Sequence, residues 1–427
     1  MDHFHYKKRQ GRLEYFAENV AIRDIVEAVG TPTYIYSHTT LRHHYNVFYD
    51  ALSRQSLRPQ IYFAMKANPN LSVLKTLAQA GAGMDILSKG EFLKAEAAGV
   101  TGQKIVFSGV GKTLDEIDYA LMHDVYQINI ESISELNLIA ARAKALNKTI
   151  EVAIRVNPDV DAKTHKHIST GGKENKFGIN IGDSPHLYQK MQAMEFIKPV
   201  AIAMHIGSQL TSLQPYAQAL SVLADMVKTL LNQGVKLKRI DIGGGLGIPY
   251  QQEQPPSPND YAAMVATHLG VFNMPIMLEP GRLIAGNAGI LVSRLLFDKP
   301  TQHKRFYIID AGMNDLMRPA LYDAYHEILP VIKPIKDKQH CQVDIVGPVC
   351  ESTDCFAKDR TIPPMMEGEL LLFRSAGAYS AAMASTYNMR PLPAEIMVKD
   401  SEFHITRARQ SYESLMAQDI LPPFLTL

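Results

Sequence analysis

Residues 61–109, IYFAMKANPNLSVLKTLAQAGAGMDILSKGEFLKAEAAGVTGQKIVFSG, carry the clearest sign of how this chain folds. Three short β-rich runs, IYFAMKAN, GAGMDILS and KIVFSG, are separated by two segments with helical periodicity. Gly81 and Gly99 stand where these two helices are expected to end, because glycine accepts the left-handed conformation of a helix C-terminus. The stretch therefore predicts strands that alternate with helices.

The alternation continues to residue 282. Five further β-rich runs follow: YQINIES, EVAIRVNP, VAIAMHIGS, KRIDIGGG and MPIMLEPGR. Thr113 with Glu116, and Ser132 with Glu135, match the capping box that opens a helix. Parallel strands need crossover helices, and eight such units in roughly 220 residues have the layout of a (β/α)₈ TIM barrel. We predict this α/β fold, with a doubly wound open sheet as the alternative.

A second domain is expected after the barrel. From about residue 285 the β-rich runs ILVSRLLF, RFYIIDAG, CQVDIVGPV and GELLLFRS follow one another without helical segments between them. This pattern is typical of an antiparallel β-barrel or sandwich, which residues 32–36 near the N-terminus are expected to join. We therefore assign residues 38–284 to the barrel, and residues 1–37 with 285–427 to the β domain.

Composition restricts the class of partner. Among 427 residues, 46% are hydrophobic and 20% charged, as in soluble globular proteins, and the net charge is +1. Such a balance provides no field that attracts nucleic acid or an anionic membrane. Residues 1–9 contain no apolar run, and no segment approaches the apolar length of a membrane span. Cys341, Cys350 and Cys355 form an odd set in a long chain, which argues against a disulfide framework. We expect a cytoplasmic protein that binds a small molecule.

Polar residues gather where the predicted strands end: Lys66, Asp85, Ser108, Glu131, Asn157, His205, Gly243 to Gly245, and Glu279. The carboxyl ends of all strands in a parallel barrel open on one rim, where barrel enzymes carry their chemistry. The sequence therefore predicts a single site built from separate segments.

Three of these features fit one cofactor. Gly243–Gly245 let backbone N–H groups approach a phosphate, although a glycine run alone is as often only a tight turn. The amine of Lys66 can form a Schiff base, and the carboxylate of Glu279 can keep a pyridine nitrogen protonated. A phosphate cradle, an amine and a carboxylate are the groups that pyridoxal 5'-phosphate requires, so we predict that cofactor.

Seven ordered motifs make the chain recognisable. YFAMKAN (62–68), HIGSQ (205–209), GGG (243–245) and EPGR (279–282) resemble the alanine-racemase-like, fold-type III pyridoxal phosphate decarboxylases. DAGMNDLMRPALY (310–322), GPVCES (347–352) and the stretch from GAY to YN (377–388) resemble the diaminopimelate decarboxylase family within that group. The resemblance covers roughly residues 20 to 410.

The resemblance implies a role for each cofactor-binding residue. Lys66 would bind the cofactor covalently, His205 would pack on its ring, and Glu279 would pair with the pyridine nitrogen. The phosphate would be held by Gly243, Gly244, Gly245, the backbone of Gly281 and Arg282, and the hydroxyl of Tyr379. Asp85 and Ser108 would line the pocket.

The resemblance also implies a reaction, the decarboxylation of meso-2,6-diaminopimelate to L-lysine, which is the last step of lysine biosynthesis. Cys350 of the partner subunit would reprotonate the reacting carbon, since a thiol has a reference pKa of about 8.5. Glu351 would bind the distal ammonium group of the substrate. The remaining substrate contacts would be Arg282, Arg318, Tyr322 and Tyr379. A site shared in this way implies a homodimer.

Other interpretations remain open. The same scaffold could decarboxylate another basic amino acid, or the protein could be a non-catalytic pyridoxal phosphate carrier. A carrier has no use for Cys350 and Glu351, which speaks against it. We predict no metal site, because Cys350 and Cys355 lack zinc-ligand spacing and His165 and His167 are expected to be exposed loop residues.

Overall fold

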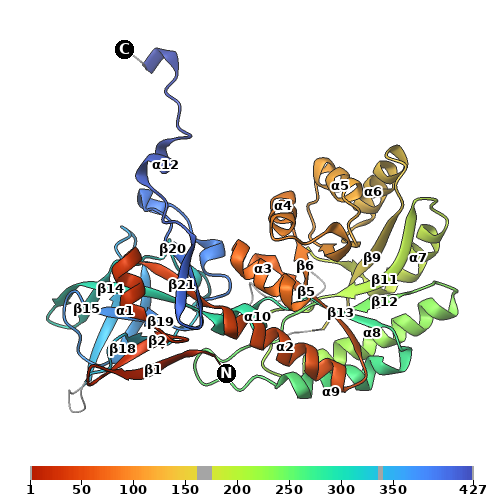
Figure 1. The fold of residues 1–427 in the computed structure, drawn as a ribbon. Coiled ribbons are helices and arrows are strands. Elements are labelled where there is room, and N and C mark those ends of the chain that lie inside the picture. Colours follow the sequence, from red (N-terminus) through yellow and green to blue (C-terminus); the bar gives the residue numbers. More distant parts are fainter. Residues whose placement is uncertain (1, 161–175, 335–339, 426–427) are drawn as a thin grey trace. The chain divides into compact units, whose positions relative to one another are not determined.

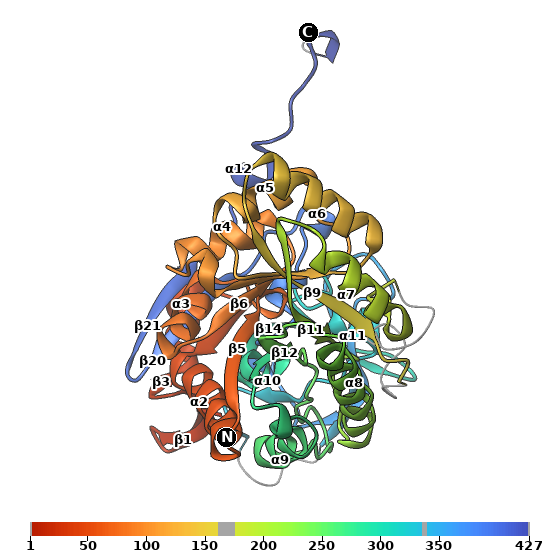
Figure 2. The same cartoon turned by 90° about the vertical axis from the view of Figure 1, so that its right-hand side faces the viewer.

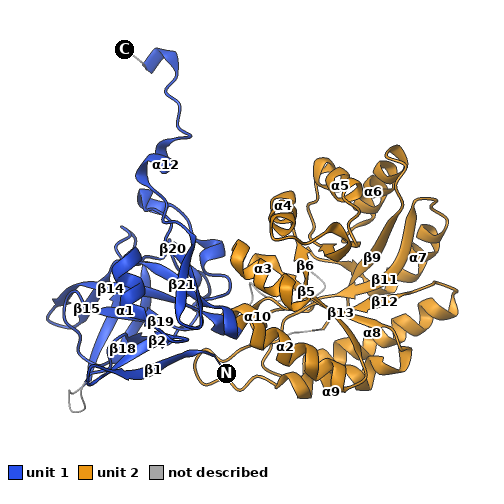
Figure 3. Cartoon of the chain, in the orientation of Figure 1, with its two compact units in different colours: residues 1–40, 287–427 blue, residues 41–286 orange. Residues whose placement is uncertain are grey.

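The computed structural model describes residues 2–160, 176–334 and 340–425. The chain forms two compact units, shown with their elements in Figures 1 and 3. Unit 1 comprises residues 1–40 and 287–427, and unit 2 comprises residues 41–286. None of the helices in the described part of the chain has the length and apolar character that a bilayer span requires.

Unit 2 is a closed parallel barrel. Its strands, in the order in which they pair, are β5 (Arg58–Ala64), β6 (Gly83–Ile86), β7 (Ile105–Phe107), β8 (Gln127–Ile130), β9 (Ile150–Asn157), β11 (Ile197–Met204), β12 (Arg239–Asp241) and β13 (Pro275–Leu278). β13 pairs in parallel with β5, which closes the ring. The short strand β10 (Ile179–Asn180) pairs with β9 outside it. The predicted TIM barrel is confirmed, and the open-sheet alternative is wrong.

Helices surround the strands, as Figure 2 shows. They are α2 (His38–Arg54), α3 (Leu71–Ala80), α4 (Lys89–Ala97), α5 (Leu114–Met122), α6 (Ile133–Ala145), α7 (Ser184–Gln192), α8 (Gln214–Asn232) and α9 (Pro258–Leu269). The short helix α10 (Arg282–Ala285) follows β13. The expected end signals are present: Gly81 ends α3 with φ 114°, and Thr113 and Glu116 form a complete capping box on α5. The box on α6 is half formed, because the carboxylate of Glu135 binds Lys112 and the N–H of Glu131 instead.

Unit 1 is a β domain. Its main sheet contains β18 (Cys355–Ile362), β17 (Cys341–Val346), β15 (Arg305–Ile309), β14 (Gly289–Pro300), β4 (Thr33–Ser37), β20 (Ala394–Lys399) and β21 (Glu402–Arg407) in that order. β19 (Leu370–Phe373) pairs with β14 and with β16 (Ile328–Pro330). A second sheet consists of β1 (Phe4–Arg9), β2 (Arg12–Ala17) and β3 (Val20–Ala21). The short helices α11 (Arg318–Tyr322) and α12 (Tyr412–Met416) also belong to this unit.

Most pairs of this β domain are antiparallel, as predicted, but β15–β17 and β4–β20 are parallel. Parallel neighbours need long connections, and both pairs have them in the sequence. The N-terminal segment joins the sheet through β4, which lies between β14 and β20. The buried face of α1 (Ile22–Val29) packs in the same hydrophobic core as Ile35, Ile290 and Ile396.

Candidate active site

The carboxyl ends of the barrel strands bring the predicted cofactor residues of unit 2 to one rim. Lys66 lies in a short 3₁₀ turn directly after β5, and Asp85 lies in the last half of β6. Ser108 follows β7, His205 follows β11, and Glu279 follows β13. These five side chains come from five strands of a closed ring, so the predicted convergence on the rim is a consequence of the barrel.

A cluster of carboxyl groups occupies this rim. Burial raises the pKa of Asp85 to about 6, against the opposing effects of the Lys66 ammonium and the Ser108 hydroxyl. Burial, followed by the negative charges of Asp241 and Asp85, raises the pKa of Glu279 well above its usual value. Burial also raises the pKa of Asp241. Water does not solvate these groups well, so the cluster retains protons that exposed carboxyl groups would have lost.

The carboxyl group of Asp241 and the neighbouring amide of Asn129 were not among the site residues predicted from the sequence. Asp241 ends β12, accepts a hydrogen bond from the N–H of Gly243 at 3.0 Å, and shares a hydrogen bond with the carboxyl group of Glu279. Asn129 in β8 donates to Ser108 Oγ at 3.0 Å. Asn129 lies in β8 and Asp241 in β12, and every residue of these two strands is buried, so a polar residue inside a buried strand is the signal that could have revealed them.

His205 is uncharged in this setting. Burial lowers its pKa well below 6.5, and the positive charges of Lys66 and Arg155 lower it further. The N–H of Gly244 donates to Nδ1 of His205 at 3.2 Å, so Nδ1 serves as an acceptor. The imidazole ring is therefore neutral and oriented by the glycine loop.

The glycine loop has no room for side chains. Gly243 and Gly245 adopt positive φ values of 64° and 110°. A Cβ atom on Gly244 would lie 2.2 Å from the carbonyl oxygen of Glu279, and one on Gly245 would lie 2.2 Å from that of Gly207. The main chain of this loop therefore approaches its surroundings more closely than any other residue type allows.

Gly281 and Arg282 follow at the start of α10. Arg282 is buried, and its guanidinium group donates to the Tyr250 hydroxyl at 2.7 Å and to Ser208 Oγ at 3.0 Å. Ser208 belongs to the HIGSQ motif, whereas Tyr250 lies outside every motif recognised in the sequence. These contacts hold the guanidinium group beside the segment that follows β11.

An ion pair at the end of the barrel binds the main chain of Gly178, which precedes β10. Arg155 Nη1 lies 2.9 Å from Glu131 Oε1, and Glu131 Oε2 accepts the N–H of Gly178 at 2.8 Å. The Arg155 guanidinium group lies 4.8 Å from the centre of the Phe177 ring. Asn157, also predicted at a strand end, is the last residue of β9. His165 and His167 lie outside the described residues.

The other predicted site residues belong to unit 1. Arg318 opens α11 and is buried, with Nη1 at 2.9 Å from His326 Nε2. His326 Nδ1 lies 2.8 Å from the carbonyl oxygen of Arg374, so Nδ1 carries the proton and Nε2 accepts from Arg318. Tyr322 ends α11, and Tyr379 adopts a positive φ of 56°. His326 was not predicted, because nothing in its local sequence marks it.

Cys350 and Glu351 lie in an exposed segment between β17 and β18. The N–H of Cys350 donates to Asn388 Oδ1 at 3.0 Å. Hydrogen bonds from the hydroxyl groups of Thr353 and Tyr387 lower the pKa of Glu351 below its usual value, so this carboxylate is ionised at neutral pH. The segment thus presents a thiol and a negative charge side by side on the surface of unit 1.

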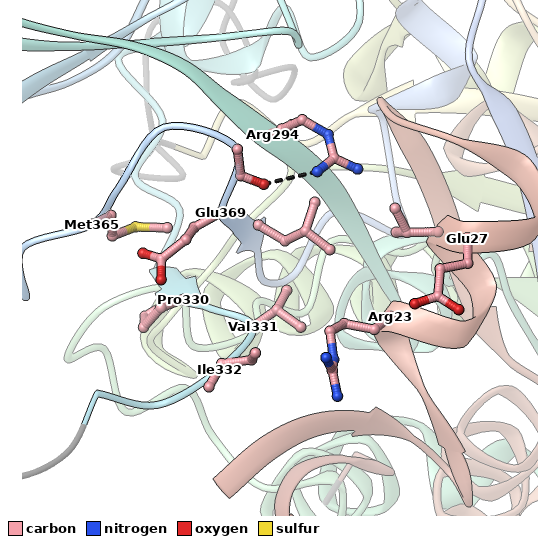
Figure 4. A pocket seen from close by; sticks show the side chains of 11 residues that line it. Arg23, Glu27, Arg294, Pro330, Val331, Ile332, Met365 and Glu369 are labelled. Carbon is pink, nitrogen blue, oxygen red and sulfur yellow. Dashed lines mark hydrogen bonds between the residues drawn. The ribbon is translucent and has the colours of Figure 1, made fainter. Parts of the chain in front are cut away.

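Unit 1 also contains a pocket of about 290 Å³ that none of the predicted site residues lines (Figure 4). Its apolar lining comes from Val26, Pro330, Val331, Ile332, Met365 and Leu370. Arg294 donates to the carbonyl oxygen of Gly368 at 2.7 Å, and Arg23 donates to Glu14 at 2.8 Å. The carboxylates of Glu27 and Glu369 also line the pocket.

The chain is similar to known pyridoxal-dependent decarboxylases in both sequence and structure. Residues 39–286 match the family model described as pyridoxal-dependent decarboxylase, pyridoxal binding domain. The diaminopimelate decarboxylase of Pseudomonas aeruginosa is 44% identical over 99% of this chain and 100% of its own length. That of Neisseria meningitidis serogroup B is 45% identical over 96% and 97%. The crystal structure of diaminopimelate decarboxylase from M. jannaschii in co-complex with L-lysine matches with a TM-score of 0.92 at 36% identity, covering 99% of both chains.

Proposed function

This chain belongs to the pyridoxal-dependent decarboxylase family, and from that premise we propose that it decarboxylates meso-2,6-diaminopimelate to L-lysine and carbon dioxide. One observation carries the proposal: relatives named diaminopimelate decarboxylase align along nearly the whole of both chains. The alignment therefore includes unit 1, which holds Cys350 and Glu351, as well as the barrel.

The residues on the barrel rim fit pyridoxal 5'-phosphate. Oδ1 of Asp85 is buried and has no hydrogen-bond partner among the described residues, as expected of a group that awaits a ligand. The glycine loop carries no side chains, so its backbone N–H groups can approach a phosphate. Lys66 provides the amine and Glu279 the carboxyl group that the cofactor's aldehyde and pyridine nitrogen need.

When bound, this cofactor supplies an electron-withdrawing ring that accepts the electron pair left by departing carbon dioxide. Lys66 would hold it through its amine, and the carboxyl group of Glu279 would face the pyridine nitrogen. Burial raises the pKa of Glu279, so its carboxyl group retains a proton that it can share with the pyridine nitrogen. His205 would pack on the ring with a neutral imidazole, which adds no charge that would compete with Glu279.

Residues of unit 1 would bind the distal end of the substrate and return a proton to it. We assign the return of a proton to Cys350 Sγ and the binding of the distal ammonium group to the ionised carboxylate of Glu351. Arg318, with Tyr322, would bind the distal carboxylate through planar N–H donors, and His326 supports that guanidinium group. L-lysine lacks the distal carboxylate, so its release would follow from the loss of these bonds.

Quaternary structure and location form part of the same proposal. Cys350 of the partner subunit would complete each site, which requires a homodimer with two shared sites. The three cysteines are all free thiols in the structure, as expected of a protein that works in the reducing cytoplasm.

A substrate panel tests the proposal. The purified protein, supplied with pyridoxal phosphate, is incubated separately with meso-diaminopimelate, ornithine, arginine and D-lysine, and carbon dioxide release is measured. We expect release from diaminopimelate at a rate at least a hundredfold above the others. Release from ornithine without release from diaminopimelate would overturn the substrate. Binding of pyridoxal phosphate without release from any of the four would indicate a carrier.

A further inference from the structure

A line of polar side chains runs through the interior of the barrel to the carboxyl cluster. Arg239 of β12 donates from Nε to Gln127 Oε1 at 2.7 Å. Gln127 donates from Nε2 to Asn129 Oδ1 at 2.7 Å, within β8. All three side chains are buried, with relative exposures of 3%, 0% and 2%. Each bond replaces contacts with water that the buried groups have lost.

Arg239 sets the direction of both hydrogen bonds. A guanidinium group has only donors, so Gln127 must turn its oxygen toward Arg239 and its nitrogen toward Asn129. Asn129 then has its oxygen occupied and must turn its nitrogen toward the rim. The orientation of both amides is thus fixed by their partners.

Arg239 is itself held in place. Its Nη1 lies 2.8 Å from Glu151 Oε2, and its guanidinium group lies 4.0 Å from the centre of the Tyr126 ring. Hydrogen bonds and charge from Lys238 and Arg239 outweigh burial and lower the pKa of Glu151, so the ion pair persists at neutral pH. Arg239 therefore remains charged and remains the donor in its hydrogen bond to Gln127.

At the other end, the nitrogen of Asn129 meets three acceptors. It lies 3.0 Å from Ser108 Oγ, 3.3 Å from Glu279 Oε1 and 3.4 Å from Asp241 Oδ2. Asp241 also binds the N–H of Gly243, so the same carboxyl group contacts both the glycine loop and Glu279. Because an amide is neutral, it can place the two carboxyl groups without forcing both to ionise, as a lysine or arginine in its place would do.

We propose that Asn129 is a positioning residue, oriented by Arg239 through Gln127, which holds the carboxyl groups of Asp241 and Glu279 in the arrangement that receives the pyridine nitrogen of the cofactor. The inference rests on the proposed function for the identity of that ring. Lys66, Asp85, Arg155 and His205 are the other charged or titratable groups that act on this cluster.

An exchange of amide and carboxyl tests the proposal. Asn129→Asp places a third carboxyl group beside those of Asp241 and Glu279, and Asp241→Asn alone removes one acid. In the double variant, the amide oxygen at position 241 can still accept the N–H of Gly243, and its nitrogen can donate to position 129 and to Glu279. Position 129, now a carboxylate, can still accept from Gln127. The double variant thus keeps one amide and one acid in nearly the same volume.

Pyridoxal phosphate affinity is measured by absorbance titration, together with the pH at which the spectrum of the bound cofactor changes. We expect each single variant to bind at least tenfold more weakly and to shift that pH, and the double variant to return within threefold of the unmodified chain. Single variants within threefold of the unmodified chain, or a double variant no better than the weaker single one, would overturn the proposal. A purely space-filling role would give no recovery.

Gln127→Glu tests whether Gln127 links Arg239 to Asn129. The new carboxylate still binds Arg239 but has no N–H for Asn129, so we expect about fivefold weaker cofactor binding. Gln302→Glu makes the same chemical change at an exposed position of unit 1 and should have no effect. If the two variants bind pyridoxal phosphate with equal affinity, Arg239 and Gln127 do not orient Asn129 in the way proposed.

Folding failures remain informative. If a single variant does not fold, recovery of folding and binding in the double variant supports the proposal, and a double variant that also fails overturns it. If the unmodified chain binds no pyridoxal phosphate, the proposed function fails. In that case the arrangement of Asn129 with Asp241 and Glu279 is tested by the midpoint of thermal unfolding of the cofactor-free proteins. Lower midpoints in the single variants and recovery in the double variant would support it.

Discussion

The rim of the barrel and the exposed segment around Cys350 hold their functional groups in different ways. On the rim, Asp85 and Glu279 are withdrawn from water and their pKa values are raised. In unit 1, Cys350 and Glu351 lie in water, and local hydrogen bonds lower the pKa of Glu351. Burial thus sets the properties of the rim carboxyl groups, whereas Cys350 and Glu351 depend little on burial for theirs.

Loss of the rim amine is expected to have the largest effect. Lys66→Ala removes the proposed covalent anchor, so carbon dioxide release should fall by a factor on the order of 10³ or more, and the absorption of the bound cofactor should disappear. Both are measured on protein purified with pyridoxal phosphate. Lys190→Ala, at an exposed position of α7, is the matched control. Retention of the cofactor absorption in Lys66→Ala would contradict the assignment.

Loss of the thiol should separate catalysis from cofactor binding. Cys350→Ala removes the proposed proton donor, which typically contributes a factor of roughly 10² to 10⁴, while the rim stays intact. We expect normal cofactor absorption with a rate reduced by about that factor. Cys355→Ala, in β18, should keep its rate. If Cys350→Ala also loses the cofactor, the two regions are not independent in the way proposed.

The raised pKa of Asp85 predicts how the stability of the cofactor-free protein varies with pH. The folded-state pKa of about 6 lies above the ordinary value of 3.8, so the folded chain binds the proton more tightly than the unfolded chain. The contribution of Asp85 to stability is therefore greatest below pH 4 and is lost as the pH rises through about 6.

Asp85→Asn should remove this dependence. Relative to the unmodified chain, the variant should gain about 1 to 2 kcal/mol in unfolding free energy between pH 5 and pH 7, measured by urea unfolding. Asp115→Asn, which changes an exposed carboxylate on α5, is the control and should show no such gain. A constant difference between the variant and the unmodified chain would mean that Asp85 is not a buried acid with a raised pKa.

The smallest effect is expected in the exposed segment. Glu351→Ala should raise the KM for diaminopimelate about fivefold, because a solvent-exposed charge pair contributes modestly to binding. Cofactor affinity and kcat should change less than twofold. Glu402→Ala, on the exposed strand β21, serves as the comparison. An unchanged KM would remove Glu351 from substrate recognition.

Local chemistry made much of the barrel predictable. The alternation of apolar runs with capped segments indicates strands and helices, and closure of eight parallel strands then places every strand end on one rim. Lys66, His205 and Glu279 follow from this reasoning because each stands next to a recognisable strand. The mixed sheet of unit 1 was harder, since β4 and β20 pair across more than 350 residues of sequence.

What sequence alone established about this protein is the order of its elements and the residue types at their ends, because these depend on neighbours along the chain. The partnership of Asn129, Asp241 and Glu279 arose only on folding, since it joins three strands that are adjacent or opposite in the closed ring but distant in sequence. The same holds for Arg239, whose donors orient an amide 112 positions away. Burial then sets the pKa values of these groups, and burial is a property of the whole barrel.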